Sequence, residues 1–196
     1  MKVFRSVDDI CSKLSETTLI SSIRFIGIDG KDGSGKTTLA QQLKETISCK
    51  LISLDDYVDE KKGSYVSNLY IEEIHKEIDK KQPTVIEGGC LLYAAELIGI
   101  KFDMLVYIKR IVPPEIWIDE DECNPKNPVE KFIENKEREL QDFVHFEKRL
   151  DEKNLNTTAK SVELPKLEKE MIRYHAKYRP VERADYVLKR IVYSNH

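Results

Sequence analysis

Four residues near the start of the chain have the types and spacing that phosphate binding requires. Gly30, Gly35, Lys36 and Thr37 satisfy the pattern G-x-x-x-x-G-K-[ST] within the stretch GIDGKDGSGKTTLA. Glycines leave no Cβ between the backbone N–H groups and the phosphate oxygens, and the lysine adds a positive charge. Residues 27–35 contain four of the chain's eight glycines. The pattern therefore predicts a loop that holds the phosphates of a nucleotide.

We expect this loop to bind ATP together with Mg²⁺. Lys36 is placed to hold the β and γ phosphates and is a catalytic candidate, while the Thr37 hydroxyl is a candidate metal ligand. A helix beginning near Lys36 would aim its free N–H groups and the positive end of its dipole at the same phosphates. The predicted ATP-binding residues are Gly30, Lys31, Asp32, Gly33, Ser34, Gly35, Lys36, Thr37 and Thr38.

Carboxylates at two other places could complete a reaction site. Asp55 and Asp56 follow the apolar run LISL, and Glu87 ends the run TVIE. Because open α/β sheets bind ligands at the carboxyl ends of their strands, we expect these side chains near the loop. Asp55 or Asp56 could accept the proton of an acceptor hydroxyl, and Thr37, Glu87 and Asp55 are the candidate Mg²⁺ ligands. The alternatives are a polar turn or helix cap at 55–56 and a solvated strand end at Glu87.

Short apolar runs alternate with helical periodicities and predict the elements that position these residues. The runs with the length and branching of strands are 23–28, 50–54, 84–86, 104–108 and 186–192. The segments with helical character are 6–14, 37–47 and 71–78. This alternation predicts an α/β fold of the three-layer P-loop NTPase type, with a mostly parallel five-stranded sheet flanked by helices.

The region after the fourth predicted strand departs from the alternation. Residues 112–128, VPPEIWIDEDECNPKNP, hold four prolines and are expected to form a loop. Two long helical patterns follow, at 129–150 and 164–178, with a break at 154–158. The acidic run 119–122 matches no motif that we can assign.

Composition limits the partners and the location. The formal net charge of −3 gives no global attraction to nucleic acid or to an anionic membrane. The four cysteines form no C-x-x-C pair, and neither a signal peptide nor a stretch of roughly 18 apolar residues is present. We expect a cytoplasmic protein with one domain over residues 1–196, in which residues 110–160 form a lid and a helical insertion. The oligomeric state does not follow from the sequence.

In the order FIGIDGKDGSGKTTLA, SLDDY and VIEGG, the chain resembles the uridine kinase group of P-loop nucleoside kinases. The resemblance implies that Asp55 is the catalytic base, that Glu87 helps to hold magnesium, and that Tyr57 lies near the substrate. The tail YHAKYRPVERADYVL also resembles the closing helix and last strand of that family. The implied activity is transfer of the γ-phosphoryl group of ATP to a nucleoside such as uridine or cytidine, in a single P-loop kinase domain.

Two features differ from that family. Uridine kinases close an arginine-rich lid over the phosphates, whereas here the fourth strand leads through Lys109 and Arg110 into an acidic loop. These two residues are the nearest lid candidates, and a solvated basic pair is the alternative. Asp32 makes the loop similar to that of thymidylate kinases, so a nucleoside monophosphate is the second candidate acceptor. An acceptor phosphate would favour nearby arginines, and residues 55–75 contain none.

A nucleotide-binding protein without kinase activity is a further alternative. Guanine specificity is disfavoured because the nearest match to N-K-x-D is NKER at 135–138. Trp117 could stack on a base or anchor the packing of its loop. The basic and aromatic cluster within 173–179 could contact the adenine or the lid, or it could divide into one packed and one solvated helix face.

Overall fold

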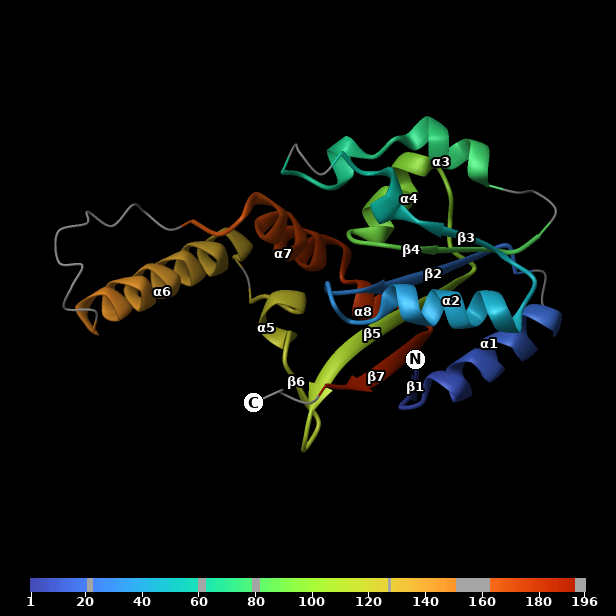
Figure 1. Ribbon diagram of the computed structural model, residues 1–196, viewed down its shortest axis with the longest axis horizontal. Helices are drawn as coiled ribbons and strands as arrows, with labels where there is room; N and C mark the ends of the chain where they lie inside the picture. Colours follow the sequence, from blue (N-terminus) through green and yellow to red (C-terminus); the bar gives the residue numbers. More distant parts are fainter. Residues whose placement is uncertain (21–22, 60–62, 79–81, 127, 151–162, 193–196) are drawn as a thin grey trace.

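The structure is a computed structural model that describes residues 1–20, 23–59, 63–78, 82–126, 128–150 and 163–192 (Figure 1). The predicted break at 154–158 lies outside the described residues. The strands are β1 (Lys2–Phe4), β2 (Phe25–Gly30), β3 (Lys50–Ser53), β4 (Thr84–Glu87), β5 (Met104–Val112), β6 (Ile116–Trp117) and β7 (Tyr186–Ile191). The helices are α1 (Val7–Ile20), α2 (Lys36–Thr46), α3 (Ile71–Glu77), α4 (Leu91–Ile98), α5 (Glu120–Cys123), α6 (Val129–Leu150), α7 (Lys166–Tyr178) and α8 (Pro180–Arg183), with 3-10 turns η1 (Leu54–Tyr57) and η3 (Val66–Asn68).

One sheet forms the middle layer of the described chain. Its strand order is β1-β7-β5-β2-β4-β3, with parallel pairing throughout, and β6 pairs antiparallel with β5. The predicted α/β fold with a parallel sheet flanked by helices is confirmed. The predicted strand number of five is wrong, because β1 and β6 bring the described sheet to seven strands. Both added strands are only two or three residues long and carry no periodic signal.

Alternating side chains of the strands supply two apolar cores, one on each face of the sheet. Ile26 and Ile28 of β2 pack with α1 and α2, whereas Phe25 packs in the core that contains residues of α3, α4 and α7. Strand side chains point alternately to the two faces, so neighbouring residues of a buried strand enter different cores. The helices of each core lie on opposite sides of the sheet in Figure 1.

The region after the fourth predicted strand contains more regular structure than expected. Strand β5 continues to Val112, and the chain then turns back so that Ile111 pairs with Trp117 in β6. Residues 120–123 form the short helix α5. The expected loop at 112–128 is therefore corrected to a hairpin followed by a helical turn.

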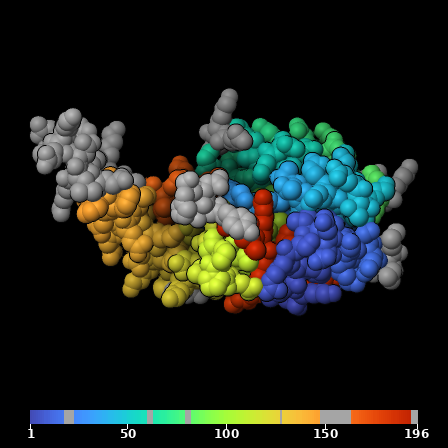
Figure 2. Space-filling model, turned by 60° about the horizontal axis from the view of Figure 1, so that its bottom comes forward, coloured from blue at the N-terminus to red at the C-terminus, as the bar shows by residue number. Residues whose placement is uncertain are grey.

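Helix α6 extends away from the sheet at one end of the molecule, as Figure 1 and the space-filling view in Figure 2 show. A small apolar cluster joins α6 to α7 through Ile133, Leu164 and Ile172. Helix α7 returns to the sheet through buried Met171 and Tyr174. It thus connects the projecting helix to the edge of the sheet where the glycine-rich loop lies.

Candidate active site

The predicted phosphate loop connects β2 to α2, as its motif requires. Gly33 and Gly35 have backbone φ angles of 72° and 96°, which residues with a Cβ rarely adopt. A Cβ at Gly35 would also collide with the guanidinium group of Arg190. Among the other predicted loop residues, Ser34 is buried, while Thr38 is exposed in the first turn of α2. The loop therefore presents its backbone N–H groups at a helix N-terminus, which is the geometry that binds phosphate.

Lys36 lies inside the loop. Its side chain is 6% exposed, and its Nζ donates to the backbone oxygens of Gly30 at 3.1 Å and Lys31 at 3.3 Å. The same Nζ is 3.6 Å from the carboxylate of Asp32, whose side chain is exposed. The lysine is thus held at the centre of the loop by two backbone oxygens and lies near the carboxylate of Asp32.

Glu87 lies directly beside the start of α2 and is fully buried. Its Oε1 accepts hydrogen bonds from Ser53 Oγ at 2.7 Å and from Thr37 Oγ1 at 3.1 Å. Burial raises the pKa of Glu87. Its Oε2 has no hydrogen-bond partner among the described residues. A buried carboxylate oxygen without a partner next to a P-loop threonine is a place where a hydrated cation would be stabilised.

These residues fit Mg²⁺ in the way that phosphoryl-transfer proteins hold it. The described residues contain no group of three or more His, Cys, Asp or Glu side chains that could form a complete metal site. Mg²⁺ is commonly bound through one or two protein groups together with water and the phosphates of the substrate. Thr37 and Glu87 could supply these protein groups. The observation that favours them as Mg²⁺ ligands is that Glu87 Oε2 has no hydrogen-bond partner among the described residues.

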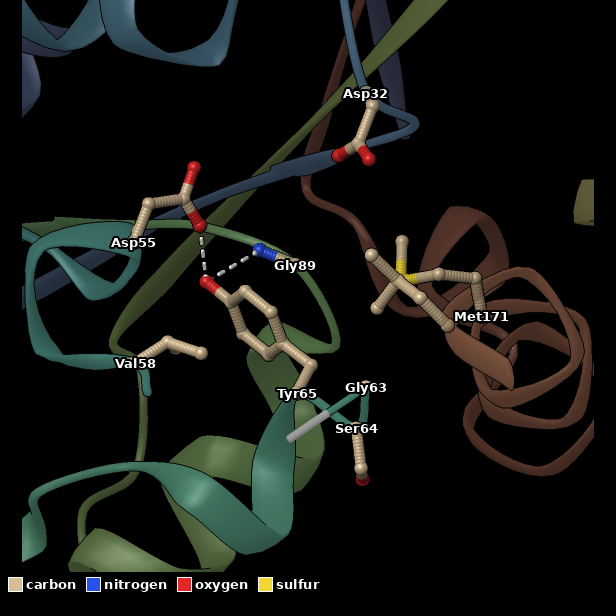
Figure 3. A pocket seen from close by; sticks show the side chains of 9 residues that line it. Asp32, Asp55, Val58, Gly63, Ser64, Tyr65, Gly89 and Met171 are labelled. Carbon is tan, nitrogen blue, oxygen red and sulfur yellow. Dashed lines mark hydrogen bonds between the residues drawn. The ribbon is translucent and has the colours of Figure 1, made fainter. Parts of the chain in front are cut away.

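Asp55 faces a pocket of about 320 Å³ between η1, the phosphate loop and α7 (Figure 3). Its Oδ1 accepts a hydrogen bond from the hydroxyl of Tyr65, which in turn accepts one from Gly89 N at 3.1 Å. Burial and the neighbouring Asp55 raise the pKa of Tyr65, so the hydroxyl stays protonated and donates. Asp32 and Met171 line the pocket opposite this pair. A molecule in the pocket would lie between Asp55 and the phosphate loop.

Two other residues predicted near Asp55 do not line this pocket. Asp56 is exposed, and the pKa of Tyr57 is raised by burial and by the nearby charge of Glu77. Tyr57 instead pairs through its backbone oxygen with Tyr70 N at 2.9 Å. The aromatic side chain that lies beside Asp55 is Tyr65, which sequence reasoning missed because it follows ten residues later and returns to the site only in the fold.

Lys109 and Arg110 lie within β5, although the sequence placed them beyond the end of a shorter strand. Lys109 Nζ is 3.7 Å from the centre of the Trp117 ring, and burial lowers the pKa of Lys109. Trp117 packs against the α7 side of the sheet, as its packing alternative predicts. Lys109 is thus occupied by an aromatic contact on the face of β5 opposite Arg110.

Arg110 and Arg190 lie next to each other on paired strands at the phosphate loop. They are in register across β5 and β7. Arg190 Nη1 donates to the backbone oxygen of Ser34 at 3.1 Å, and Arg110 Nη1 is 3.5 Å from the position of a Cβ on Gly33. Sequence reasoning missed Arg190 because its distance from the loop along the chain is large and only the sheet order brings them together.

The acidic run at 119–122 lies against Arg110 and against two lysines, Lys31 and Lys136. Buried Asp119 accepts two hydrogen bonds from Arg110, one of them at 2.8 Å, and this contact raises the pKa of Arg110. Glu122 pairs with Lys31 of the phosphate loop and with Lys136 of α6. Asp119 and Glu122, which belong to the acidic run that matched no motif, therefore neutralise basic groups around the loop.

A buried polar chain joins the phosphate loop to α7. Asp29, directly before Gly30, accepts a hydrogen bond from Gly30 N at 2.7 Å and another from the hydroxyl of Tyr174. Burial raises the pKa of Asp29. His175 is also buried, bonds to Tyr107 Oη at 3.0 Å, and has its pKa lowered by burial. The buried Tyr174 and His175 thus form the packed side of the cluster that the sequence singled out at 173–179.

No helix in the described ranges is long and apolar enough to cross a membrane.

Comparisons with known proteins find kinases. No protein-family model matches the chain. It is 31% identical over 124 residues to the "Adenylate kinase isoenzyme 6 homolog" of Schizosaccharomyces pombe, covering 58% of this chain and 67% of that protein. It is 30% identical over 95 residues to the "Probable thymidylate kinase" of Pyrococcus horikoshii, covering 47% of this chain and 42% of that protein, so it spans less than half of this relative. A solved structure described as a possible uridine kinase from Bacillus stearothermophilus is 18% identical, with a TM-score of 0.49 and coverage of 93% of this chain and 98% of that one.

Proposed function

Because this chain belongs to the P-loop kinases, we propose that it transfers the γ-phosphoryl group of ATP to a hydroxyl group of a small, nucleoside-like molecule. The observation that carries this proposal is the position of Asp55, whose carboxylate faces the pocket beside the phosphate loop. A carboxylate there suits an acceptor that must lose a proton when it reacts. The pocket volume of about 320 Å³ falls within the range of small-molecule sites.

The proposed reaction conserves atoms and charge in the following way. The acceptor hydroxyl oxygen forms a bond to the γ-phosphorus, the bond from that phosphorus to the β–γ bridging oxygen breaks, and ADP leaves. The hydroxyl proton passes to Asp55. The hydrogen bond from Tyr65 orients the carboxylate of Asp55 so that one oxygen is held and the other remains available.

The other residues act by positioning and by charge stabilisation. Lys36 and the loop N–H groups would hold the phosphates, and the Lys36 ammonium already lies within the loop, where its Nζ contacts the backbone oxygens of Gly30 and Lys31. Arg110 and Arg190 would offset the charge that develops on the transferred group and stand in for an arginine-rich lid. Thr37 and Glu87 would hold Mg²⁺, which supplies further neutralisation of the phosphate charge when it is bound.

A nucleoside monophosphate kinase is the second candidate, because the two named relatives are adenylate and thymidylate kinases. In that case the acceptor atom is a phosphate oxygen, which carries no proton that a base must remove, and Asp55 would be dispensable. A nucleotide-binding protein without kinase activity is the third candidate. It would bind ATP without any acceptor-dependent release of ADP.

ADP production from ATP and Mg²⁺ tests these candidates, using a panel of nucleosides, nucleoside monophosphates, vitamins and sugars. We expect one acceptor to stimulate turnover, and Lys36→Ala and Asp55→Asn to reduce it by at least about 100-fold. Lys131→Ala, an exposed lysine on α6, is the control. Undiminished turnover in Asp55→Asn would contradict the proposed base, and ATP binding without turnover for any acceptor would favour the binding protein.

A further inference from the structure

An open groove of about 510 Å³ runs along α7. Four basic side chains line it, all from α7, namely Lys166, Lys169, Arg173 and Lys177. Their spacing of three to four residues places them along one side of the helix, over a length of about 16 Å. The groove is therefore a local concentration of positive charge in a chain whose net charge is −3.

Glu170, which lines the groove, already accepts hydrogen bonds from one side chain and from two backbone N–H groups. Glu170 accepts hydrogen bonds from Ser64 Oγ at 3.0 Å, from Tyr65 N at 2.7 Å and from Val66 N at 3.1 Å. These bonds fix the start of η3 against α7. The carboxylate of Glu170 thus has structural partners that would remain when an anion enters the groove.

The four cations differ in their availability. Lys169 pairs with Glu137 at 2.6 Å, and Arg173 makes two bonds of 2.7 Å with Glu130. Within the described part of the chain, neither Lys166 nor Lys177 has a carboxylate partner. Lys177 Nζ donates only to the neutral hydroxyl of Tyr178, at 3.4 Å, among the hydrogen bonds of the described residues. Lys166 and Lys177 therefore lie near opposite ends of the groove with positive charges that no carboxylate of the described residues neutralises.

Aromatic rings and hydroxyl groups accompany these lysines. Tyr93 and Tyr178 are stacked with their ring centres 5.6 Å apart, and Lys177 Nζ lies 4.9 Å from the centre of the Tyr178 ring. Ser67 Oγ donates to Ser64 Oγ at 2.9 Å and Ser64 Oγ donates to Glu170, so the hydroxyl groups of the lining are held by bonds within the protein. The lysines are therefore the side chains of the groove that could bind a phosphate or a similar anion.

The groove adjoins the proposed acceptor pocket. Gly63 and Ser64 line both, and Leu167 and Met171 of the same helix form the pocket wall that faces Asp55. A single small molecule could thus place a hydroxyl near Asp55 and another group among the lysines of α7. This arrangement has no local signal in the sequence, because the basic residues of α7 lie about a hundred residues beyond the segment 55–75, which has no arginine.

We propose that the acceptor carries a phosphate or similar anionic group at a distance from the hydroxyl that is phosphorylated, and that the groove along α7 binds this group. The inference rests on the proposed kinase function and names its substrate class as a small phosphorylated alcohol. The reaction adds a second phosphate ester to such a molecule. A nucleoside monophosphate kinase would instead extend the existing phosphate to a diphosphate.

Matched acceptors that differ only in a phosphate test the proposal. KM is measured for uridine, uridine 3′-monophosphate and uridine 5′-monophosphate, and for ribose and ribose 5-phosphate, with ATP and Mg²⁺. We expect a phosphorylated acceptor to have a KM at least about tenfold below that of its unphosphorylated counterpart, and ³¹P NMR to show a new phosphomonoester. Lys166→Ala combined with Lys177→Ala should remove most of this difference by raising only the KM for the phosphorylated acceptor.

Lys44→Ala combined with Lys131→Ala is the charge-matched control, because both lysines are exposed on other helices. Equal KM values with and without phosphate, or equal effects of the two double variants, would overturn the groove inference while leaving the kinase function intact. A diphosphate product would also overturn it and would favour the monophosphate kinase.

If none of these acceptors stimulates turnover, equilibrium dialysis with radiolabelled uridine monophosphates still decides the role of the groove. Binding that weakens about tenfold in the Lys166→Ala and Lys177→Ala double variant would support the anion site. Absent binding, or binding that this variant leaves unchanged, would overturn it. The failure of turnover would count separately against the proposed kinase function.

Discussion

Tyr65 and Asp55 form the pair of side chains on which the proposed chemistry depends. Removing the hydroxyl with Tyr65→Phe leaves Asp55 Oδ1 and Gly89 N without this partner. We expect kcat to fall by about tenfold while KM for ATP changes little, because the carboxylate keeps its charge and loses its orientation. Steady-state kinetics check this, with circular dichroism to establish that the variant folds.

Tyr57→Phe separates the tyrosine implied by the family resemblance from the one that lies in the pocket. Tyr57 does not line the pocket, so its variant should keep wild-type kcat and KM. Tyr70→Phe, at an exposed tyrosine, is a neutral comparison. A loss of activity in Tyr57→Phe together with full activity in Tyr65→Phe would assign the substrate contact to Tyr57 and contradict our reading of the pocket.

Glu87 should make stability depend on pH. Burial raises its pKa above the ordinary value of 4.5, so the folded protein retains a proton that the unfolded chain releases. The stabilisation is complete below the unfolded pKa and is lost as the pH rises through the folded pKa. The glutamine of Glu87→Gln does not titrate. The Tm of this variant minus the Tm of wild type should therefore increase by roughly 2 °C or more as the pH rises from about 4 to about 7 in EDTA.

Adding Mg²⁺ and ATP should stabilise wild type more than Glu87→Gln, because a bound cation favours the charged carboxylate of Glu87. The Tm of wild type should increase more than that of Glu87→Gln when both ligands are added at neutral pH. Glu45→Gln, at an exposed position on α2, should behave as wild type in both series. Parallel Tm curves for wild type and Glu87→Gln, with and without Mg²⁺, would show that Glu87 neither titrates nor contributes to the metal site.

At the scale of elements, the segment β5–β6–α5 is tied to the phosphate loop by buried charge. Arg110→Ala would leave buried Asp119 with Lys31 at 3.7 Å as its remaining ion-pair partner in the described chain. We expect a loss of roughly 2–3 kcal/mol in the free energy of unfolding, measured with urea. The double variant Arg110→Ala with Asp119→Ala should cost less than the sum of the single variants by roughly 1–2 kcal/mol.

The Arg173–Glu130 pair provides the comparison, since it has similar two-bond geometry but both side chains are about half exposed. Its cycle should show a much smaller coupling that added salt weakens further. Equal coupling in the two cycles would mean that burial of Asp119 does not strengthen its bond to Arg110.

The elements that could be predicted from the sequence are those whose signal is local. The runs that became β2, β3, β4, β5 and β7 are apolar and bounded by turns, and the glycine-rich motif lies between a strand and a helix by definition. Strands β1 and β6 were not predicted, because two or three residues are too few to show an alternating pattern and only the pairing with a neighbouring strand identifies them. Tyr65, Arg190 and the lysines of α7 escaped for the same reason, since sheet order and helix docking bring them to the site.

At the scale of the whole molecule, α7 connects the two proposed ligand sites. Its Leu167 and Met171 form the wall of the acceptor pocket, and its Tyr174 donates to Asp29 at the start of the phosphate loop. A nucleotide that orders the loop should therefore also favour the position of α7 that binds the acceptor. By linkage, the acceptor must then raise the affinity for the nucleotide by the same factor.

Tyr174→Phe tests this coupling, because it removes the bond to Asp29 together with the bond from Leu92 N and keeps the ring in the core. For wild type we expect the acceptor to tighten the binding of a non-hydrolysable ATP analogue by about fivefold, and for Tyr174→Phe by less than about twofold. Tyr186→Phe on β7, whose ring packs against Phe4 with the ring centres 5.6 Å apart, should keep the wild-type factor. Calorimetric titrations with and without acceptor measure both. Undiminished coupling in a folded Tyr174→Phe protein would mean that the two sites communicate by another route, such as direct contact between the acceptor and the γ-phosphate, since Asp29 would then have no part in joining them.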